Sequence, residues 1–193
     1  MKLNQHISEL GLLLKSRGIR HVLITPGSRN APLIQLFTKG KNFIPHSLVD
    51  ERSAGYVALG MARELNAPVL LVCTSGTAVL NLSPAVAEAF HQCIPLVILS
   101  ADRPREKISQ FNNQVINQNA PYFNHSKGFF EMPFELRTES ELKQALLSVG
   151  LLLDEALGPD AGPVRVYVPL RAPLYELLPE PGHWFLLPPR TSV

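Results

Sequence analysis

Three short polar segments of the 193-residue chain carry the side chains best suited to binding or catalysis. They are residues 25–30, 74–77 and 100–105, and each follows a run of β-branched and aliphatic residues typical of a strand. Ligands of open parallel sheets bind beyond the carboxyl ends of the strands, so we expect the three segments to meet along one edge. The polar candidates they contribute are Ser28, Arg29, Ser75, Thr77, Asp102 and Arg103.

Two arginines of this set, Arg29 and Arg103, suit ligands that carry carboxylate or phosphate groups. A guanidinium presents a planar fork of donors that matches such anions. The other interpretation is that both arginines pair with Asp50, Glu51 or Asp102 and only hold loops. The residues alone leave both interpretations open.

Other chemistries have weaker support. The turns at Gly27 and Gly76 could each hold a phosphate at a helix N-terminus, but neither matches a dinucleotide-binding or P-loop pattern. The sequence contains no G-x-S-x-G motif, so it gives no indication of a serine hydrolase. The histidines form no triad or metal-binding pattern; they are His6, His21, His46, His91, His125 and His183.

The segment that begins at Asp50 predicts the start of a helix. Asp50 is a good N-cap, and the helix dipole favours a carboxylate such as Glu51 in the first turn. Ordinary capping and a functional carboxylate are both open at this point. The helix is rich in small residues, which favours either tight packing on its own sheet or a subunit interface; they are Ala54, Gly55, Ala58, Gly60 and Ala62.

The elements that would position these residues alternate along the chain. Helices are predicted over residues 3–17, from about 31 to 38, and over 51–65, 78–90 and 141–157, and strands over 21–25, 43–49, 69–73, 96–99 and 164–168. Residues 100–140 are expected to be polar and irregular. Continuously apolar strands alternating with helices predict an α/β fold, a doubly wound and mostly parallel sheet with helices on both faces.

Composition narrows the class of protein. Hydrophobic residues make up 46% and charged residues 18% of the chain, and the net charge is +2, which excludes disorder and argues against a nucleic-acid partner. No apolar run is long enough for a membrane segment, so we expect a cytoplasmic protein. Cys73 and Cys93 lie beside apolar runs without a CxxC pair and are predicted to be buried free thiols.

The last part of the chain is rich in proline, with 8 of the 17 prolines between Pro159 and Pro189. We therefore expect one domain over residues 1–178 and a linker over 179–193 that leads toward a missing domain.

Several segments in the same order and spacing resemble one family. They are Thr25-Pro-Gly-Ser-Arg-Asn-Ala-Pro-Leu33, Asp50-Glu51-Arg52 with its small-residue helix, Thr74-Ser-Gly-Thr-Ala78, Ser100-Ala-Asp-Arg-Pro104 and Asn113-Gln114. The chain from about residue 8 to 175 is similar to the N-terminal part of the MenD family, the thiamine-diphosphate-dependent 2-succinyl-5-enolpyruvyl-6-hydroxy-3-cyclohexene-1-carboxylate (SEPHCHC) synthases of menaquinone biosynthesis. The resemblance implies a pyrimidine-binding domain.

The resemblance also implies a cofactor site. Glu51 matches the glutamate that contacts N1′ of the aminopyrimidine, where a shared proton favours the tautomer able to remove the C2 proton of the thiazolium. Thr77 and Asn81 lie where related enzymes approach the pyrimidine ring. In that family Mg²⁺ or Mn²⁺ and the diphosphate are bound by a Gly-Asp-Gly…Asn motif of a C-terminal domain. This sequence has no Gly-Asp-Gly, so no metal ligand is expected here and the chain alone is expected to be inactive.

The family reaction, a transferase reaction, decarboxylates 2-oxoglutarate and adds the succinyl semialdehyde carbanion equivalent to isochorismate. Positions near these substrates are matched by Ser28, Arg29, Arg103, Asn113 and Gln114. The resemblance further implies a homodimer or homotetramer of the complete enzyme. The alternative is a stand-alone, non-catalytic binding or regulatory domain of the same fold.

Overall fold

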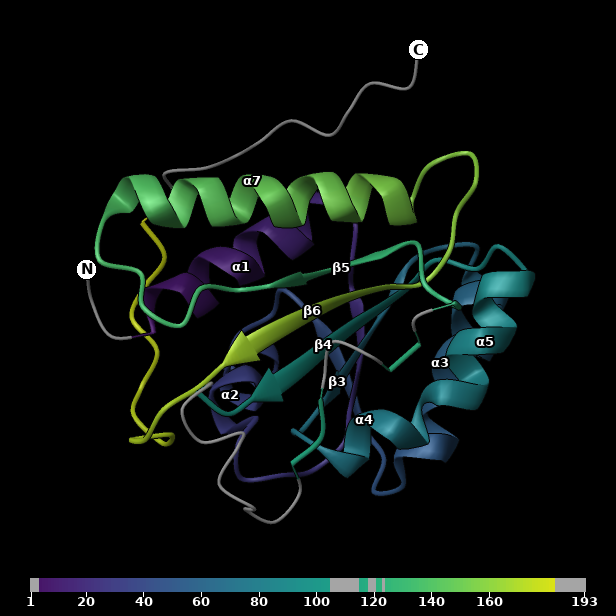
Figure 1. Ribbon diagram of the computed structural model, residues 1–193, viewed down its shortest axis with the longest axis horizontal. Helices are drawn as coiled ribbons and strands as arrows, with labels where there is room; N and C mark the ends of the chain where they lie inside the picture. The colour runs from purple at the N-terminus through teal and green to yellow at the C-terminus, as the bar shows by residue number, and fades with distance from the viewer. Residues whose placement is uncertain (1–3, 105–114, 118–120, 123, 183–193) are drawn as a thin grey trace.

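A six-stranded sheet forms the centre of the protein (Figure 1). The computed structural model describes residues 4–104, 115–117, 121–122 and 124–182. The strands are β1 (His21–Ile24), β2 (Ile44–Ser47), β3 (Val69–Cys73), β4 (Leu96–Asp102), β5 (Gly128–Glu131) and β6 (Val164–Pro169). Their order is β2-β1-β3-β4-β6-β5, and every neighbouring pair is parallel.

Helices cover both faces of this sheet (Figure 1). One face carries α1 (Gln5–Ser16), α2 (Ala31–Thr38) and α7 (Glu139–Ala156). The opposite face carries α3 (Glu51–Leu65), α4 (Thr77–Asn81) and α5 (Ser83–His91). The predicted doubly wound α/β fold is confirmed.

Alternate residues along the central strands supply the two cores, because successive side chains of a strand point to opposite faces. In β3, Leu70 and Val72 pack with α1, α2 and α7, whereas Val69, Leu71 and Cys73 pack with α3, α4 and α5. All five of these residues are fully buried, which explains why the strand is continuously apolar.

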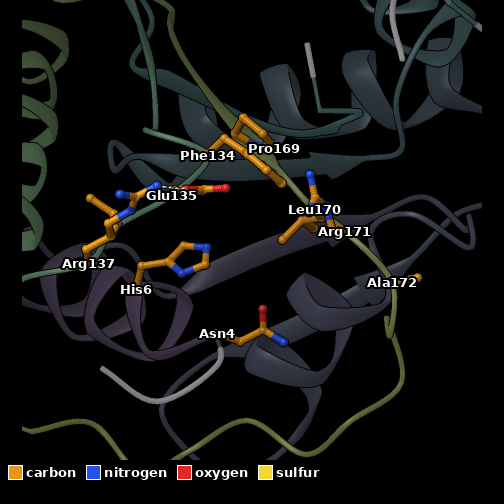
Figure 2. Close-up of a pocket in the computed structure, with 10 residues that line it drawn as sticks. Asn4, His6, Phe134, Glu135, Arg137, Pro169, Leu170, Arg171 and Ala172 are labelled. Carbon is orange, nitrogen blue, oxygen red and sulfur yellow. Dashed lines mark hydrogen bonds and ion pairs between the residues drawn. The ribbon is translucent and has the colours of Figure 1, made fainter. Parts of the chain in front are cut away.

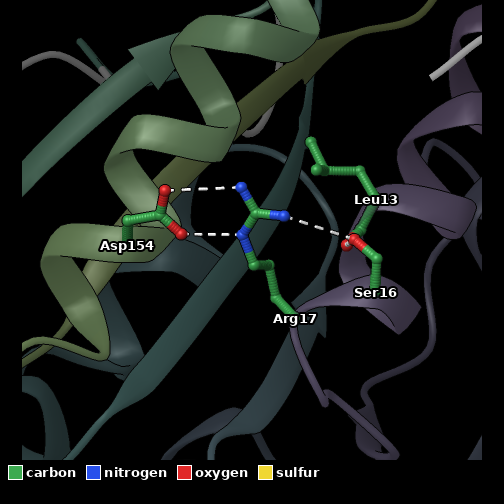
Figure 3. Close-up of polar contacts among 4 residues, drawn as sticks. All are labelled: Leu13, Ser16, Arg17 and Asp154. Atoms are coloured by element: carbon green, nitrogen blue, oxygen red, sulfur yellow. Dashed lines mark hydrogen bonds and ion pairs between the residues drawn. The ribbon is translucent and has the colours of Figure 1, made fainter. Parts of the chain in front are cut away.

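A buried ion pair joins α1 to α7 on the first face (Figure 3). Arg17 follows α1, and its Nε donates to Asp154 Oδ1 of α7 at 2.7 Å while its Nη2 donates to Oδ2 at 3.3 Å. The two side chains are only 3% and 11% exposed. This two-pronged contact fixes the approach of the first and last helices, which are far apart in the sequence.

The sequence predicted one helix over residues 78–90, but the structure has two, α4 and α5. The prediction of a continuous helix is therefore wrong. Pro84 has no N–H to donate to the carbonyl of Leu80, so the α-helical hydrogen-bond ladder is interrupted there. The Ser83 hydroxyl donates to that carbonyl instead, at 2.7 Å. The chain therefore turns at Leu82, and α4 is left as a separate helix of five residues.

Two parts of the segment 100–140 that the structure describes form strands, although the segment was predicted to be irregular. Strand β4 extends to Asp102, and β5 lies within the segment expected to be irregular. Strand β5 has four residues, lies beside β6 at the edge of the sheet as far as the chain is described, and is only partly buried. Such a short edge strand depends on its neighbour for pairing, so its own sequence carries little signal.

Four of the five small residues predicted on α3 pack within the chain, and Gly60 is exposed. Ala54, Gly55, Ala58 and Ala62 are buried, and a Cβ at Gly55 would lie 2.9 Å from Cβ of Ala85 in α5. This supports tight packing as the role of these residues.

Of the two free thiols, Cys73 is buried as predicted. Cys93 is exposed in the turn between α5 and β4, so the prediction of burial is wrong for that residue.

The C-terminal residues 179–182 run along α1. Ser8 Oγ donates to the carbonyl of Pro179 at 2.6 Å, and Gln5 Nε2 donates to that of Glu180 at 3.2 Å.

Candidate active site

The loops that follow β1, β3, β4 and β6 lie on one edge of the sheet, because all strands run in the same direction. This places the three polar segments of the sequence together, as expected for a parallel sheet. Each of the site residues that the structure describes is positioned by the end of a strand or the first turns of a helix.

The loop between β1 and α2 carries Ser28 and Arg29. Asn30 is fully buried at its end, and its Nδ2 donates to the carbonyl of Thr25 at 2.9 Å, which closes the loop. A Cβ at Gly27 would lie 2.4 Å from Cβ of Thr74, so only glycine permits this loop to contact the loop after β3. Ser28 is exposed at the apex.

Arg29 points back toward the last strand. Its Nη1 donates to the carbonyl of Leu170, just after β6, at 2.8 Å. Burial lowers the pKa of Arg29, the positive charge of Arg103 lowers it further, and the carboxylate of Asp102 opposes both effects. The two arginines and Asp102 therefore lie within electrostatic range of one another.

Arg103 connects the end of β4 to the loop after β3. Its Nη1 donates to Ser75 Oγ at 3.0 Å, and its backbone N–H donates to Asp102 Oδ1 at 2.7 Å.

Asp50, one of the carboxylates considered as a loop-holding partner, instead accepts from the backbone N–H of Ser53 at 2.7 Å as the N-cap of α3. That bond lowers the pKa of Asp50.

Glu51 is the first residue of α3 and is partly buried. Its position is apparent from its effect on Cys73, the last residue of β3: burial raises the pKa of that thiol, and the negative charge of Glu51 raises it further. Glu51 therefore lies near the carboxyl end of β3, beside the turn that leads to α4.

Thr77 and Asn81 lie at the two ends of α4, and both side chains are exposed. Gly76 begins this helix with φ 79° and ψ −132°, a conformation open to glycine and rarely to other residues. Helix α3 packs against α4, so Glu51, Thr77 and Asn81 come from adjacent helices. Ser75 belongs to the same turn, which links this group to the arginines.

Asn113 and Gln114 lie outside the described residues. Among the residues that the structure does describe, no group of three or more His, Cys, Asp or Glu side chains could hold a metal ion. Within the same part of the chain, no helix is long and apolar enough to cross a membrane.

A cavity of about 370 Å³ lies beside the end of β6 and is lined in part by Pro169 and Leu170 (Figure 2). Figure 2 shows His6 and Arg137 on one side of it and Leu170 and Arg171 on the other. Leu170 lines this cavity, and its backbone carbonyl accepts the Arg29 hydrogen bond. Sequence reasoning did not identify Leu170, because a backbone acceptor leaves no signal in residue type.

The family of the chain follows from comparison with known proteins. A family profile described as "Thiamine pyrophosphate enzyme, N-terminal TPP binding domain" matches residues 1–122. The chain belongs to this family of thiamine pyrophosphate enzyme domains.

Within that family its relatives are SEPHCHC synthases. The 2-succinyl-5-enolpyruvyl-6-hydroxy-3-cyclohexene-1-carboxylate synthase of Desulfotalea psychrophila is 46% identical over 182 residues, which cover 93% of this chain and 34% of the relative. The synthase of Christiangramia forsetii is 44% identical over 177 residues, which cover 85% of this chain and 30% of that relative. The resemblance to the MenD family is confirmed, and the chain spans about a third of the length of these relatives.

A solved structure shows the same fold. The thiamine diphosphate-dependent 4-hydroxybenzoylformate decarboxylase of Rhodococcus jostii RHA1 superposes with a TM-score of 0.70 at 22% identity, over 84% of this chain and 30% of that one.

Proposed function

We propose that this chain is the pyrimidine-binding domain of a SEPHCHC synthase, a transferase of menaquinone biosynthesis. The complete enzyme would decarboxylate 2-oxoglutarate and add the resulting succinyl semialdehyde carbanion equivalent to isochorismate. The observation that carries the proposal is the convergence of Arg29 and Arg103 at the carboxyl edge of the sheet, where burial and mutual repulsion lower the pKa of Arg29. Two cations held this close favour a polyanionic ligand, and both substrates carry carboxylates.

The described residues fit the aminopyrimidine half of thiamine diphosphate. Glu51 can share a proton with a ring nitrogen, and Thr77 and Asn81 present a hydroxyl and an amide from the neighbouring helix. When bound, the cofactor supplies the nucleophilic carbon and the electron sink that decarboxylation of a 2-oxo acid requires. The role proposed for Glu51 is to hold or release a proton at the pyrimidine N1′.

Five side chains are proposed to bind the substrates, namely Ser28, Arg29, Arg103, Asn113 and Gln114. Ser28 is exposed beside Arg29 and can donate to a substrate oxygen. Ser75 and Leu170 orient the two guanidinium groups through the hydrogen bonds at 3.0 and 2.8 Å. Asn113 and Gln114 are assigned to isochorismate or to the reaction intermediate from the family resemblance alone.

Further parts of the proposal concern the rest of the enzyme. We place the ligands of the diphosphate and of Mg²⁺ or Mn²⁺ in a C-terminal domain, so this chain alone would be inactive. We also propose a cytoplasmic homodimer or homotetramer. The place of these ligands in another domain is supported by the share of the relatives that the chain covers. The oligomeric state is assigned from the family resemblance alone, and the cytoplasmic location from the sequence alone.

The test uses the complete synthase with 2-oxoglutarate, isochorismate, thiamine diphosphate and Mg²⁺. We expect formation of the SEPHCHC product, and Glu51→Gln should slow C2 proton exchange of bound cofactor by about a hundredfold or more. Glu64→Gln, an exposed glutamate near the other end of α3, is the matched control and should leave exchange unchanged. Absence of product in the wild-type enzyme would refute the proposed activity.

A titration distinguishes the alternative. Calorimetry of this 193-residue chain with isochorismate or 2-oxoglutarate should show no tight binding if the domain acts only within the synthase. Tight binding to the chain, together with an inactive complete protein, would instead support a binding or regulatory domain.

A further inference from the structure

Tyr122 has an unusual backbone conformation and a buried hydroxyl. Its φ of 67° lies in the left-handed region, which bulky residues rarely adopt, and its side chain is only 7% exposed. The hydroxyl donates to the carbonyl of Val79, the central residue of α4. A strained residue persists only where its surroundings hold it in place, so this contact is part of a fixed arrangement.

Arg165 holds Tyr122 from the other side. It is the second residue of the otherwise apolar strand β6 and is 1% exposed. Its guanidinium carbon lies 5.0 Å from the ring centroid of Tyr122 and 4.3 Å from that of Tyr167, distances typical of cation–π contacts.

The hydrogen bonds of Arg165 reach the same segment. Nη1 donates to the carbonyl of Pro121 at 2.8 Å, and Nη2 donates to the hydroxyl of Tyr167. Nε has no hydrogen-bond partner among the described residues. Burying a cation is costly, and the aromatic rings and two acceptors offset part of that cost here.

Helix α4 needs such support because it has only five residues. A helix of this length is unstable by itself, since nucleation is unfavourable and few hydrogen bonds follow. The Val79 carbonyl already accepts from the backbone N–H of Leu82 at 3.2 Å, and the Tyr122 hydroxyl adds a contact from outside the helix.

We propose that Tyr122 and Arg165 are positioning residues that set the place of α4, and through it the positions of Thr77 and Asn81 toward the cofactor. The inference about the cofactor rests on the proposed function, whereas the support of α4 rests on the contacts alone. Chain segments from β6, from residues 121–122 and from α4 thereby act as one unit.

Two matched substitutions test this. Tyr122→Phe keeps the ring beside Arg165 and removes the hydroxyl that reaches Val79. Tyr167→Phe removes a hydroxyl from the same buried cluster and keeps both the ring beside Arg165 and the Arg165 hydrogen bond to Pro121. Arg165→Lys, which loses the guanidinium hydrogen bond to Pro121 that Tyr167→Phe keeps, is the second test variant should Tyr122→Phe fail to fold.

The first measurement is amide hydrogen exchange on this chain. Tyr122→Phe should speed exchange of the α4 amides about fivefold relative to those of β3, the effect expected for one lost hydrogen bond. Tyr167→Phe should leave that ratio at the wild-type value. Arg165→Lys should change it in the same direction as Tyr122→Phe.

The second measurement uses the complete synthase. Tyr122→Phe should raise the half-saturating concentration of thiamine diphosphate about fivefold while kcat at saturating cofactor stays within about twofold. A purely structural defect would lower the active fraction and thus kcat, without changing half-saturation. Tyr167→Phe should change neither quantity.

Each contrary result has a separate meaning. Equal exchange in Tyr122→Phe and wild type would overturn the support of α4. Faster exchange with unchanged half-saturation would overturn the link to the cofactor. A wild-type synthase that does not bind thiamine diphosphate would refute the proposed function, and the exchange data would still decide whether Tyr122 supports α4.

Discussion

Arg103 is bonded to Ser75, with a distance of 3.0 Å between Nη1 and Oγ. This bond joins the carboxyl ends of β4 and β3, and Ser75 lies two residues before Thr77, at the start of α4. The side chain proposed to bind a substrate carboxylate is therefore fixed to the turn that leads to the proposed cofactor side chains.

Removal of the Ser75 hydroxyl should weaken substrate binding. Ser75→Ala in the complete synthase is expected to raise the KM for isochorismate about fivefold, because Arg103 loses one orienting acceptor. Arg103→Ala should raise it about tenfold or more, since a charged hydrogen bond to substrate is then lost. Steady-state kinetics measure both changes, and Ser148→Ala on α7 is the control. An unchanged KM in Arg103→Ala would remove this residue from the substrate site.

Gly27 should not tolerate a side chain. A Cβ there would lie 2.4 Å from Cβ of Thr74, so Gly27→Ala should lower the free energy of unfolding by about 1–3 kcal/mol and displace Arg29. Gly60→Ala is the opposite control, because a Cβ there meets nothing within 4 Å and alanine is favoured inside a helix by about 0.5–1 kcal/mol. Chemical denaturation of both variants measures the difference. Equal stabilities would show that the two loops can separate without cost.

The buried pair between Arg17 and Asp154 should be important for stability (Figure 3). Asp154→Ala leaves Arg17 buried without its carboxylate partner and is expected to cost about 3 kcal/mol. The double substitution Arg17→Met with Asp154→Leu should recover much of that loss, because no unpaired charge remains. Glu135→Gln, in the exposed pair with Arg137, should change little. A small loss in Asp154→Ala would mean that water reaches Arg17.

Acid should destabilise the protein partly through His6. Burial lowers the pKa of His6 from 6.5 to about 4, in a cavity wall that it shares with Glu135, Arg137 and Arg171. The unfolded chain takes up this proton near pH 6.5 and the folded chain only near pH 4. The stability that His6 contributes is therefore complete above 6.5 and is lost as the pH falls through that window.

The measurement compares wild type with His6→Gln at about pH 7.5 and about pH 4.5. The loss of unfolding free energy on acidification should be smaller in the variant by up to about 3 kcal/mol, because glutamine takes up no proton. His91→Gln, at an exposed position, should behave as wild type. An identical acid response in His6→Gln would show that His6 is accessible to protons in the folded state.

Local patterns in the sequence were sufficient for the main elements and the class of fold. The apolar runs at β1, β3, β4 and β6 predicted buried parallel strands, because only a strand covered on both faces is continuously apolar. The Asp50 N-cap was predicted from its residue type, and the loops after β1, β3 and β4 were predicted from the polar residues that follow each apolar run.

Tertiary structure alone decided which side chains meet. The contact of Arg29 with the Leu170 carbonyl joins residues 141 positions apart, and the acceptor is a backbone atom that any residue could supply. Strand β5 exists because β6 offers a partner, and α4 is separate because Pro84 breaks the hydrogen-bond ladder. An arginine within the apolar strand at Arg165 was a visible signal, but its partners Pro121 and Tyr122 depend on the folded path of the chain. Local propensity acts over a few residues, whereas these contacts arise from burial and pairing between distant segments.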